Sequence, residues 1–225
     1  TADFRMMRAS FEENEDLARW FAQCQQEPIE RFGALFEPAT MRFYNGILPD
    51  REPDRIFMAV DEAFGGGDYV SAPVCYEIDG DFYIHDVVFN NGDKYVTRPL
   101  IKDMILKHKI QAIQFEETKT TTDYHEWVDT ELRKEGYRAN ITWKAPGSQK
   151  SKDRRIYDKA PEIREMYFLE DGIRSKEYQR FMQNIFSFTY EGKNKHDDAP
   201  DSMAQLCDMK YGGSYARCEA FARPF

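Results

Sequence analysis

The sequence predicts an α/β domain built on a mixed central sheet, with antiparallel and parallel strands and helices on both faces. The first indication is the apolar run 56–60, which ends in Asp61 and a glycine-rich turn and is typical of a strand buried on both faces. The second is a pair of strand-like runs around the turn 79–81, which predicts an antiparallel hairpin. The third is the alternation of helices and strands over 97–143, which predicts parallel strands joined by crossovers.

The elements of this core are recognised by their apolar periodicity and by the residues that break it. Helices show apolar side chains three and four positions apart, as at Tyr124, Trp127 and Val128, and Gly136 ends that helix. In order, we expect strands at 56–61, 69–78 and 82–89, a helix at 97–108, a strand at 111–115, a helix at 122–134 and a strand at 137–143. This order is that of an RNase H-like fold, which has a mixed five-stranded sheet with helices on both faces.

The segments on either side of this core are expected to be less regular. Residues 1–54 contain a helix at about 10–26 and then several prolines and glycines, which predict a lead-in or linker packed on the edge of the domain. The domain itself is expected to span 55–210 and a C-terminal tail 211–225. Its later elements are expected as a helix at about 152–160, a strand at 166–169, a helix at 176–188 and a helix from the acidic run 197–201 to about 207.

Composition narrows the classes of function. The 225 residues are 41% hydrophobic and 15% aromatic, which is enough for one well-cored domain with an appendage. Asp and Glu number 40 against 31 Lys and Arg, and the net charge of −9 argues against binding nucleic acid by bulk charge. This net charge is still compatible with an enzyme that contacts nucleic acid through metal ions and a local strip of basic residues. The four cysteines lack metal-ligand spacing, which indicates buried thiols in a reducing compartment, and no apolar run predicts a membrane span.

Acidic residues stand at the ends of three expected elements. They are Asp61, Glu116, and Asp198 together with Asp201. Each also has a simpler explanation. Asp61 could be a turn residue, Glu116 and Glu117 a solvated pair, and Asp198 a helix cap with Asp201 in the first turn. In the expected fold, however, the first and fourth strands are neighbours, and carboxylates that meet at their ends would repel each other without a cation. Oxygen ligands favour Mg²⁺ or Mn²⁺, and a third carboxylate would complete a pocket for two ions roughly 3.5–4 Å apart, which is the arrangement for in-line attack on a phosphodiester.

Other polar residues lie close to these acids in the sequence. Asp197 is an alternative to Asp198 as a metal ligand, and Asp201 shares a helix face with Asp198. His196 is a candidate proton shuttle or phosphate contact, and a solvated loop residue in the other interpretation. The polar run 146–155 is locally basic, and it is either a solvated loop and helix start or a phosphate-contacting strip. Its candidate DNA contacts are Lys150, Lys152 and Arg154.

Over residues 36–207, the sequence resembles the C-terminal nuclease domain of the large terminase subunit of tailed double-stranded DNA bacteriophages. The resemblance lies in the run VDEAFGGGD at 60–68, where the family has an Asp-x-Ala-Gly-Gly-Gly-like turn, and in Phe115-Glu116 after a strand. It also lies in KSKDRRI at 150–156, similar to a Lys-x-x-Arg-Ile run, and in KHDDAPDSMA at 195–204, the most specific piece. The lead-in 21–36 resembles the segment that joins the family's motor domain to its nuclease. Residues 118–121 depart from the Asn-Asn-Gly-Gly-like run of many relatives, which leaves the choice between Glu116 and Glu117 open.

The resemblance implies a metal-dependent endonuclease that cuts concatemeric viral DNA at the start and end of packaging into a procapsid. On this basis we expect Asp61 to bridge two Mg²⁺ or Mn²⁺ ions, Glu116 to hold one and Asp198 the other, with Asp201 as the next candidate. Gly66 is expected to let the DNA backbone approach Asp61. The implied partners are double-stranded DNA, the terminase small subunit and the portal, and the implied location is the host-cell cytoplasm at the procapsid portal.

Such terminases also carry an ATPase motor, which we expect to lie outside this chain. The motif G-x-x-x-x-G-K-[ST] does not occur in the sequence, so ATP hydrolysis by that route is not expected. Two other interpretations stay open. One is a different RNase H-like nuclease, such as a junction resolvase or an enzyme that cuts RNA–DNA hybrids. The other is a non-catalytic docking domain of the packaging motor, in which the acids are caps and surface charges.

Overall fold

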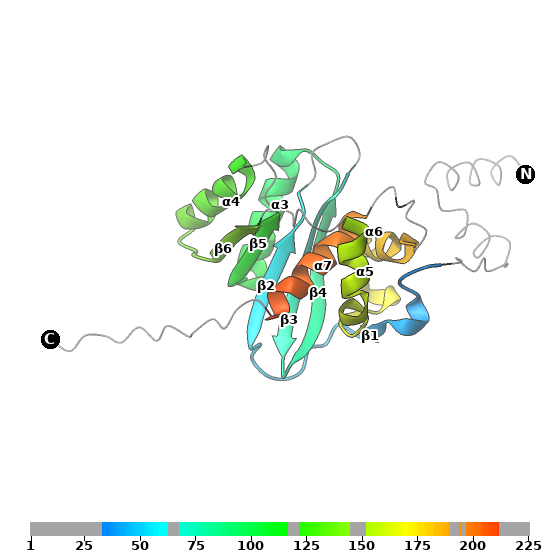
Figure 1. Ribbon diagram of the computed structural model, residues 1–225. Helices are drawn as coiled ribbons and strands as arrows, with labels where there is room; N and C mark the ends of the chain where they lie inside the picture. Colours follow the sequence, from blue (N-terminus) through cyan, green and yellow to red (C-terminus); the bar gives the residue numbers. More distant parts are fainter. Residues whose placement is uncertain are drawn as a thin grey trace, which may run out of the picture.

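The computed structural model describes residues 33–62, 68–116, 122–144, 152–189, 194 and 197–211 (Figure 1). The strands are β1 (Arg42–Tyr44), β2 (Arg55–Val60), β3 (Val70–Ile78), β4 (Asp81–Asn90), β5 (Ala112–Glu116), β6 (Asn140–Lys144) and β7 (Tyr167–Leu169). The α-helices are α3 (Lys94–His108), α4 (Thr122–Lys134), α5 (Lys152–Arg164), α6 (Lys176–Ser187) and α7 (Asp198–Tyr211). Two 3₁₀ turns lie at Pro38–Thr40 and Asp171–Ile173. The helix expected at about 10–26 lies outside the described residues.

Within the described residues, the strands form one mixed sheet in the order β1-β7-β4-β3-β2-β5-β6. Strand β3 is antiparallel to both β2 and β4, as the predicted hairpin requires. On one side of this unit β2, β5 and β6 are parallel, and on the other side β4, β7 and β1 are parallel. The predicted mixed sheet is therefore confirmed, but it is wider by β7 and β1 than the five strands expected.

The edge strand β1 comes from the segment expected to pack on the edge of the domain. It pairs in parallel with β7, and the preceding residues Leu35 and Phe36 are buried in the core. The backbone N–H of Leu35 donates to the carbonyl oxygen of Phe188 at 3.0 Å. A strand of three residues between turn-forming residues shows too little alternation to stand out in a sequence. The division of the chain at residue 54 stays a prediction.

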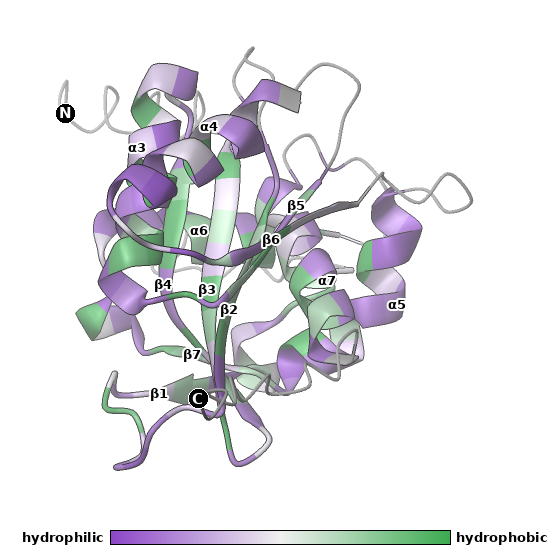
Figure 2. Cartoon of the chain, turned by 90° about the vertical axis from the view of Figure 1, so that its left-hand side faces the viewer, coloured by the Kyte–Doolittle hydropathy of each residue, from purple (hydrophilic) through white to green (hydrophobic). Residues whose placement is uncertain are grey.

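Both faces of the sheet are covered by helices, and alternate strand residues enter different cores because the side-chain period of a strand is two. In β2, Ile56, Met58 and Val60 pack with α3 and α4. Phe57 and Ala59 point the other way and pack with α5, α6 and α7. Figure 2 shows α3 and α4 on one side of the sheet and α5 and α7 on the other. The prediction that this strand is buried on both faces is confirmed.

Some helix limits differ from those predicted because caps and tertiary packing decide them. Helix α3 begins earlier than expected, since the side chain of Asp93 accepts two backbone N–H groups of the first turn. Helix α5 continues through Pro161 to its last turn, where Ile163 is buried in the core. In α7, the N–H of Asp201 donates to the carbonyl oxygen of Asp197 at 2.9 Å. Asp197 therefore stands in the N-cap position, which the simpler interpretation of the sequence assigned to Asp198.

Tyr178 joins β4 to β7 at the point where their pairing ends. Its buried hydroxyl donates to the carbonyl oxygen of Ile84 at 2.7 Å and accepts the N–H of Leu169 at 3.1 Å. Without the hydroxyl, two buried backbone groups lose their partner. We therefore expect Tyr178→Phe to lower the free energy of unfolding by roughly 2–4 kcal/mol, measured by denaturant titration. Tyr95→Phe, at an exposed tyrosine, should change it by less than about 0.5 kcal/mol, and equal losses in the two variants would contradict this role.

Candidate metal centre

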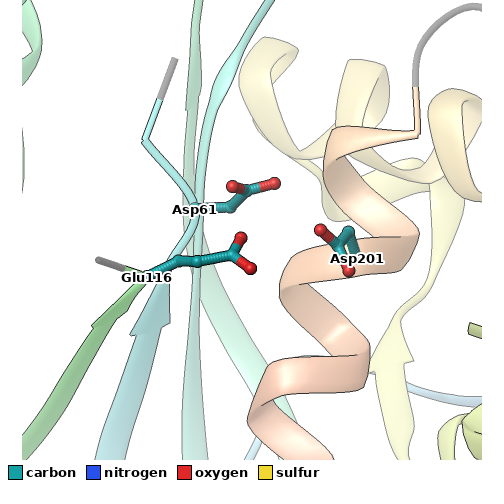
Figure 3. Close-up of side chains that lie close together, drawn as sticks. All are labelled: Asp61, Glu116 and Asp201. Atoms are coloured by element: carbon teal, nitrogen blue, oxygen red, sulfur yellow. The ribbon is translucent and has the colours of Figure 1, made fainter. Parts of the chain in front are cut away.

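Two parallel strands end side by side and deliver Asp61 and Glu116 to the same edge of the sheet. In the pairing of β2 with β5, Val60 lies opposite Phe115. The residues that follow them, Asp61 and Glu116, are therefore neighbours as well. Val60 and Phe115 face the core under α3 and α4. Because side chains alternate, Asp61 and Glu116 point to the other face, toward α7 (Figure 3). The predicted meeting of these two carboxylates is confirmed.

Helix α7 lies across this face and adds Asp201. One oxygen from each of Asp61, Glu116 and Asp201 lies within 4.8 Å of the others, and Figure 3 shows the three side chains converging. The hydroxyl of Ser202, the next residue of α7, lies 2.7 Å from the hydroxyl of Ser71 on β3, which fastens the helix to the sheet. Asp201 is 0% exposed and Asp61 is 7% exposed. The sheet edge thus carries a buried triad of carboxylates.

Two oxygens of this triad are buried without a hydrogen-bond donor from the described residues. They are Oδ2 of Asp61 and Oδ2 of Asp201. A buried carboxylate oxygen without a donor is costly, so such an atom points to a missing partner. Hard oxygen ligands of this kind suit Mg²⁺ or Mn²⁺ rather than a softer metal. The residues therefore fit a divalent cation.

Lys152, at the start of α5, brings a positive charge to these same oxygens. Its Nζ lies 3.6 Å from Oδ2 of Asp61, 3.3 Å from Oδ2 of Asp201 and 2.9 Å from Oδ1 of Asp197. Burial lowers the pKa of Lys152, but Asp61, Asp201 and Asp197 together raise it above its usual value. The ammonium thus stays charged and balances part of the acidic cluster. Its predicted contact with DNA phosphate stays a prediction.

Arg155 contacts the other side of the triad. Its Nη1 donates to Oε1 of Glu116 at 3.2 Å, and its Nε donates to Oδ1 of Asp201 at 2.9 Å. Gln205, one turn after Asp201 on α7, donates through Nε2 to Oε2 of Glu116 at 2.9 Å. Both oxygens of Glu116 therefore already have donors.

Neither Arg155 nor Gln205 was among the residues predicted for the site. A signal for Arg155 was present, because Lys152 and Arg155 are three positions apart and share one face of a helix. Arg154 lies off that face, is exposed, and pairs with Asp158 of the same helix at 3.0 Å. Gln205 had no comparable signal, since its role depends on where α7 crosses the sheet.

The remaining predicted site residues lie around the triad or outside the described part. The carboxylate of Asp198 accepts the backbone N–H of Tyr69 at 3.1 Å, next to β3, and is not one of the three converging acids. Asp197 reaches the site through Lys152. Three predicted residues lie outside the described part of the chain, namely Lys150, His196 and Gly66.

Burial and neighbouring acids raise the pKa values of two of the converging acids, Asp61 and Asp201. Burial raises the pKa of Asp61 well above its usual value; Lys152 opposes this rise, and the neighbouring Asp201 and Glu116 add to it. Burial likewise raises the pKa of Asp201, against the lowering effect of Lys152 and Arg155. Ionisation of these two acids is thus unfavourable without a nearby cation, as expected for carboxylates that bind a metal ion.

These shifts predict that metal stabilisation depends on pH. A carboxyl group with a raised pKa in the folded chain favours folding at low pH, and this contribution is lost as the pH rises through the folded pKa. A metal ion must displace the remaining protons. We therefore expect Mn²⁺ to raise the melting temperature more at about pH 8 than at about pH 5, in thermal scans with and without MnCl₂. In Asp61→Asn this difference should shrink, and an Mn²⁺ effect that is independent of pH would contradict the assignment.

Comparisons with known proteins agree with this architecture. No protein-family model matches the sequence, and no curated protein matches it. The human cytomegalovirus terminase nuclease domain, Mn-soaked and inhibitor-bound, aligns with a TM-score of 0.53 and 8% identity, over 78% of this chain and 95% of that chain. The large terminase of a thermophilic bacteriophage aligns with a TM-score of 0.51 and 11% identity, over 78% of this chain and 43% of that chain.

At such low identity the likeness defines the fold. The chain has the RNase H-like fold of a terminase nuclease domain, which confirms the predicted fold class. It matches less than half of the large terminase of the thermophilic bacteriophage, so the activities of that longer protein do not transfer with the fold. Among the described residues, each helix is too short or too polar to cross a membrane.

Proposed function

We propose that this chain is the nuclease domain of a terminase large subunit, a divalent-metal-dependent endonuclease that cuts concatemeric double-stranded viral DNA during packaging. The observation that carries the proposal is the pair of buried carboxylate oxygens without a donor, beside a third carboxylate at the edge of the sheet. The likeness of the fold to terminase nuclease domains supports the same class of enzyme.

In this proposal each residue of the metal centre has a defined task. Asp61 and Asp201 hold the cation through the Oδ2 atoms that accept no hydrogen bond, and Glu116 closes the pocket from β5. A divalent ion at such a site polarises the scissile phosphodiester and makes water a better nucleophile near neutral pH. Asp198 accepts the N–H of Tyr69, just before β3, and so holds the start of α7 against the start of β3. Lys152 neutralises part of the acidic charge when DNA and metal are absent.

The sequence-based expectations about DNA and partners become part of the proposal. DNA contacts are assigned to Lys150, Lys152, Arg154 and Gly66, and a proton-carrying or phosphate-binding role to His196. The net charge of −9 implies that this chain alone binds DNA weakly and in a salt-sensitive manner. Stronger binding of DNA would come from the ATPase motor, the small subunit and the portal, at the procapsid in the host cytoplasm.

The test is cleavage of supercoiled plasmid in MnCl₂, MgCl₂ or EDTA, with a four-way junction and an RNA–DNA hybrid as parallel substrates. We expect nicked and linear plasmid with either metal and intact plasmid in EDTA. Cleavage of only the junction or only the hybrid would instead identify another RNase H-like nuclease. No cleavage of any substrate, together with no effect of Mn²⁺ on the melting temperature, would favour a docking domain.

A further inference from the structure

Five of the six oxygens of the carboxylate triad fall into two groups, according to the groups that contact them. Oδ2 of Asp61 and Oδ2 of Asp201 lack a hydrogen-bond donor and face only the ammonium of Lys152, at 3.6 and 3.3 Å, among the described residues. Both oxygens of Glu116 and Oδ1 of Asp201 are instead bound by Arg155 and Gln205. Of these two groups, only the first can bind a metal ion without breaking hydrogen bonds.

Arg155 bridges the second group as a metal ion would. Its guanidinium spans two carboxylates from different elements, Glu116 on β5 and Asp201 on α7. A guanidinium is planar, permanently charged and rich in donors, so it suits a fixed bridge between two carboxylates. Beside a reacting phosphodiester the guanidinium would supply positive charge, which is the electrostatic task of a second ion. Unlike a metal ion, the guanidinium is part of the chain and does not have to bind from solution.

The position of Arg155 is held by the packing of its helix. The next residue of α5, Ile156, is 0% exposed, and Ala160 one turn later is 1% exposed. Both belong to the core that α7 also enters. The side chain of Arg155 is 21% exposed, compared with 67% for its neighbour Arg154. Arg155 is therefore anchored in the site, whereas Arg154 extends into solvent.

The charge of the cluster also matches a single ion. Among the described residues, the carboxylates in contact with Lys152 or Arg155 belong to Asp61, Glu116, Asp197 and Asp201. Four negative charges against two positive ones leave an excess that one divalent ion balances.

We propose that Arg155 takes the place of a second metal ion, so that the site binds one divalent cation between Asp61 and Asp201. This inference rests on the proposed metal-dependent function and replaces the expectation of two ions. Glu116 then acts through Arg155 and Gln205, as a positioning residue that holds the guanidinium in the site. Removal of the guanidinium frees oxygens of Glu116 and Asp201 and opens a second metal position.

The test counts the Mn²⁺ ions bound per chain, from the loss of the free-Mn²⁺ electron paramagnetic resonance signal during titration. We expect one ion in the wild type, two in Arg155→Met and one in Arg155→Lys, which keeps a charge at this position. The matched control is Arg133→Gln, at an exposed arginine that pairs within its own helix, and it should bind one ion.

The possible results separate this inference from the function on which it rests. Two ions in the wild type, or one ion in a folded Arg155→Met variant, would overturn the role of Arg155 and leave a metal-dependent nuclease intact. No Mn²⁺ binding by the wild type would overturn both. If Arg155→Met does not fold, the wild-type count decides alone, since one ion supports the inference and two ions refute it.

Discussion

Asp201→Asn is expected to reduce metal-dependent cleavage of plasmid DNA by more than about 100-fold, because loss of a ligand exceeds the 10–100-fold effects of residues that only support ligands. Asn keeps the shape of the side chain but removes its negative charge and replaces one oxygen with an NH₂ group. The folded chain should persist, because the substitution removes a carboxylate whose pKa burial raises. Asp61→Asn should show the same loss, measured as initial rates in MnCl₂.

Asp198→Asn distinguishes the two acids of the first turn of α7. Its carboxylate accepts the N–H of Tyr69 and lies outside the triad, so we expect a decrease of only about 10-fold in the rate of cleavage. Asp129→Asn, at an exposed ion pair of α4, should cut at the wild-type rate. A larger loss of cleavage rate in Asp198→Asn than in Asp201→Asn would mean that Asp198 is the metal ligand, as predicted from the sequence.

Phe115→Ala is expected to lower the free energy of unfolding by about 3–5 kcal/mol, the usual cost of removing a buried aromatic ring. Phe115 is 0% exposed and lies on β5, between β2 and β6, beside Tyr124 and His125 of α4. It also precedes Glu116 in β5, so the cavity would loosen the strand end that carries this acid. The measurement is denaturant unfolding with a check that the m-value is unchanged.

Phe43→Ala provides the matched comparison at the edge of the same sheet. Phe43 lies on β1, is only half-buried, and packs against the core together with Arg174. Its loss should cost clearly less than the loss of Phe115. Equal costs for the two variants would mean that the burial of the side chain does not determine the loss of stability.

The central part of the fold and two of the converging acids could be predicted because they follow from local rules. An apolar run ending in Asp61 and a strand ending in Glu116 are visible in the sequence, and the strand–helix–strand order predicts that they are parallel neighbours. Strand periodicity then fixes the face to which both acids point. These inferences need only the sequence within each element and the order of the elements.

The rest of the site depends on how helices lie on the sheet, which the sequence does not specify. Asp198 and Asp201 both lie in the first turn of α7, and only the docking of the helix against Ser71 decides which of them meets Asp61. Arg155 belongs to the site because α5 packs beside α7. Strand β1 was missed because its few residues are held by pairing with β7, not by a pattern of their own.

The distance along the chain between the parts of the metal centre has a consequence for the synthesis of the protein. Asp61 and Glu116 are made early, whereas α7 brings Asp201 and Gln205; its contacts with the first hairpin span 129 and 131 positions. A nascent chain without α7 has neither the carboxylate of Asp201 nor the amide of Gln205 that donates to Glu116. Contacts between such distant segments form late in folding. On the proposed function, the nuclease is therefore inert on the ribosome and becomes able to cut DNA only when its last described helix has docked.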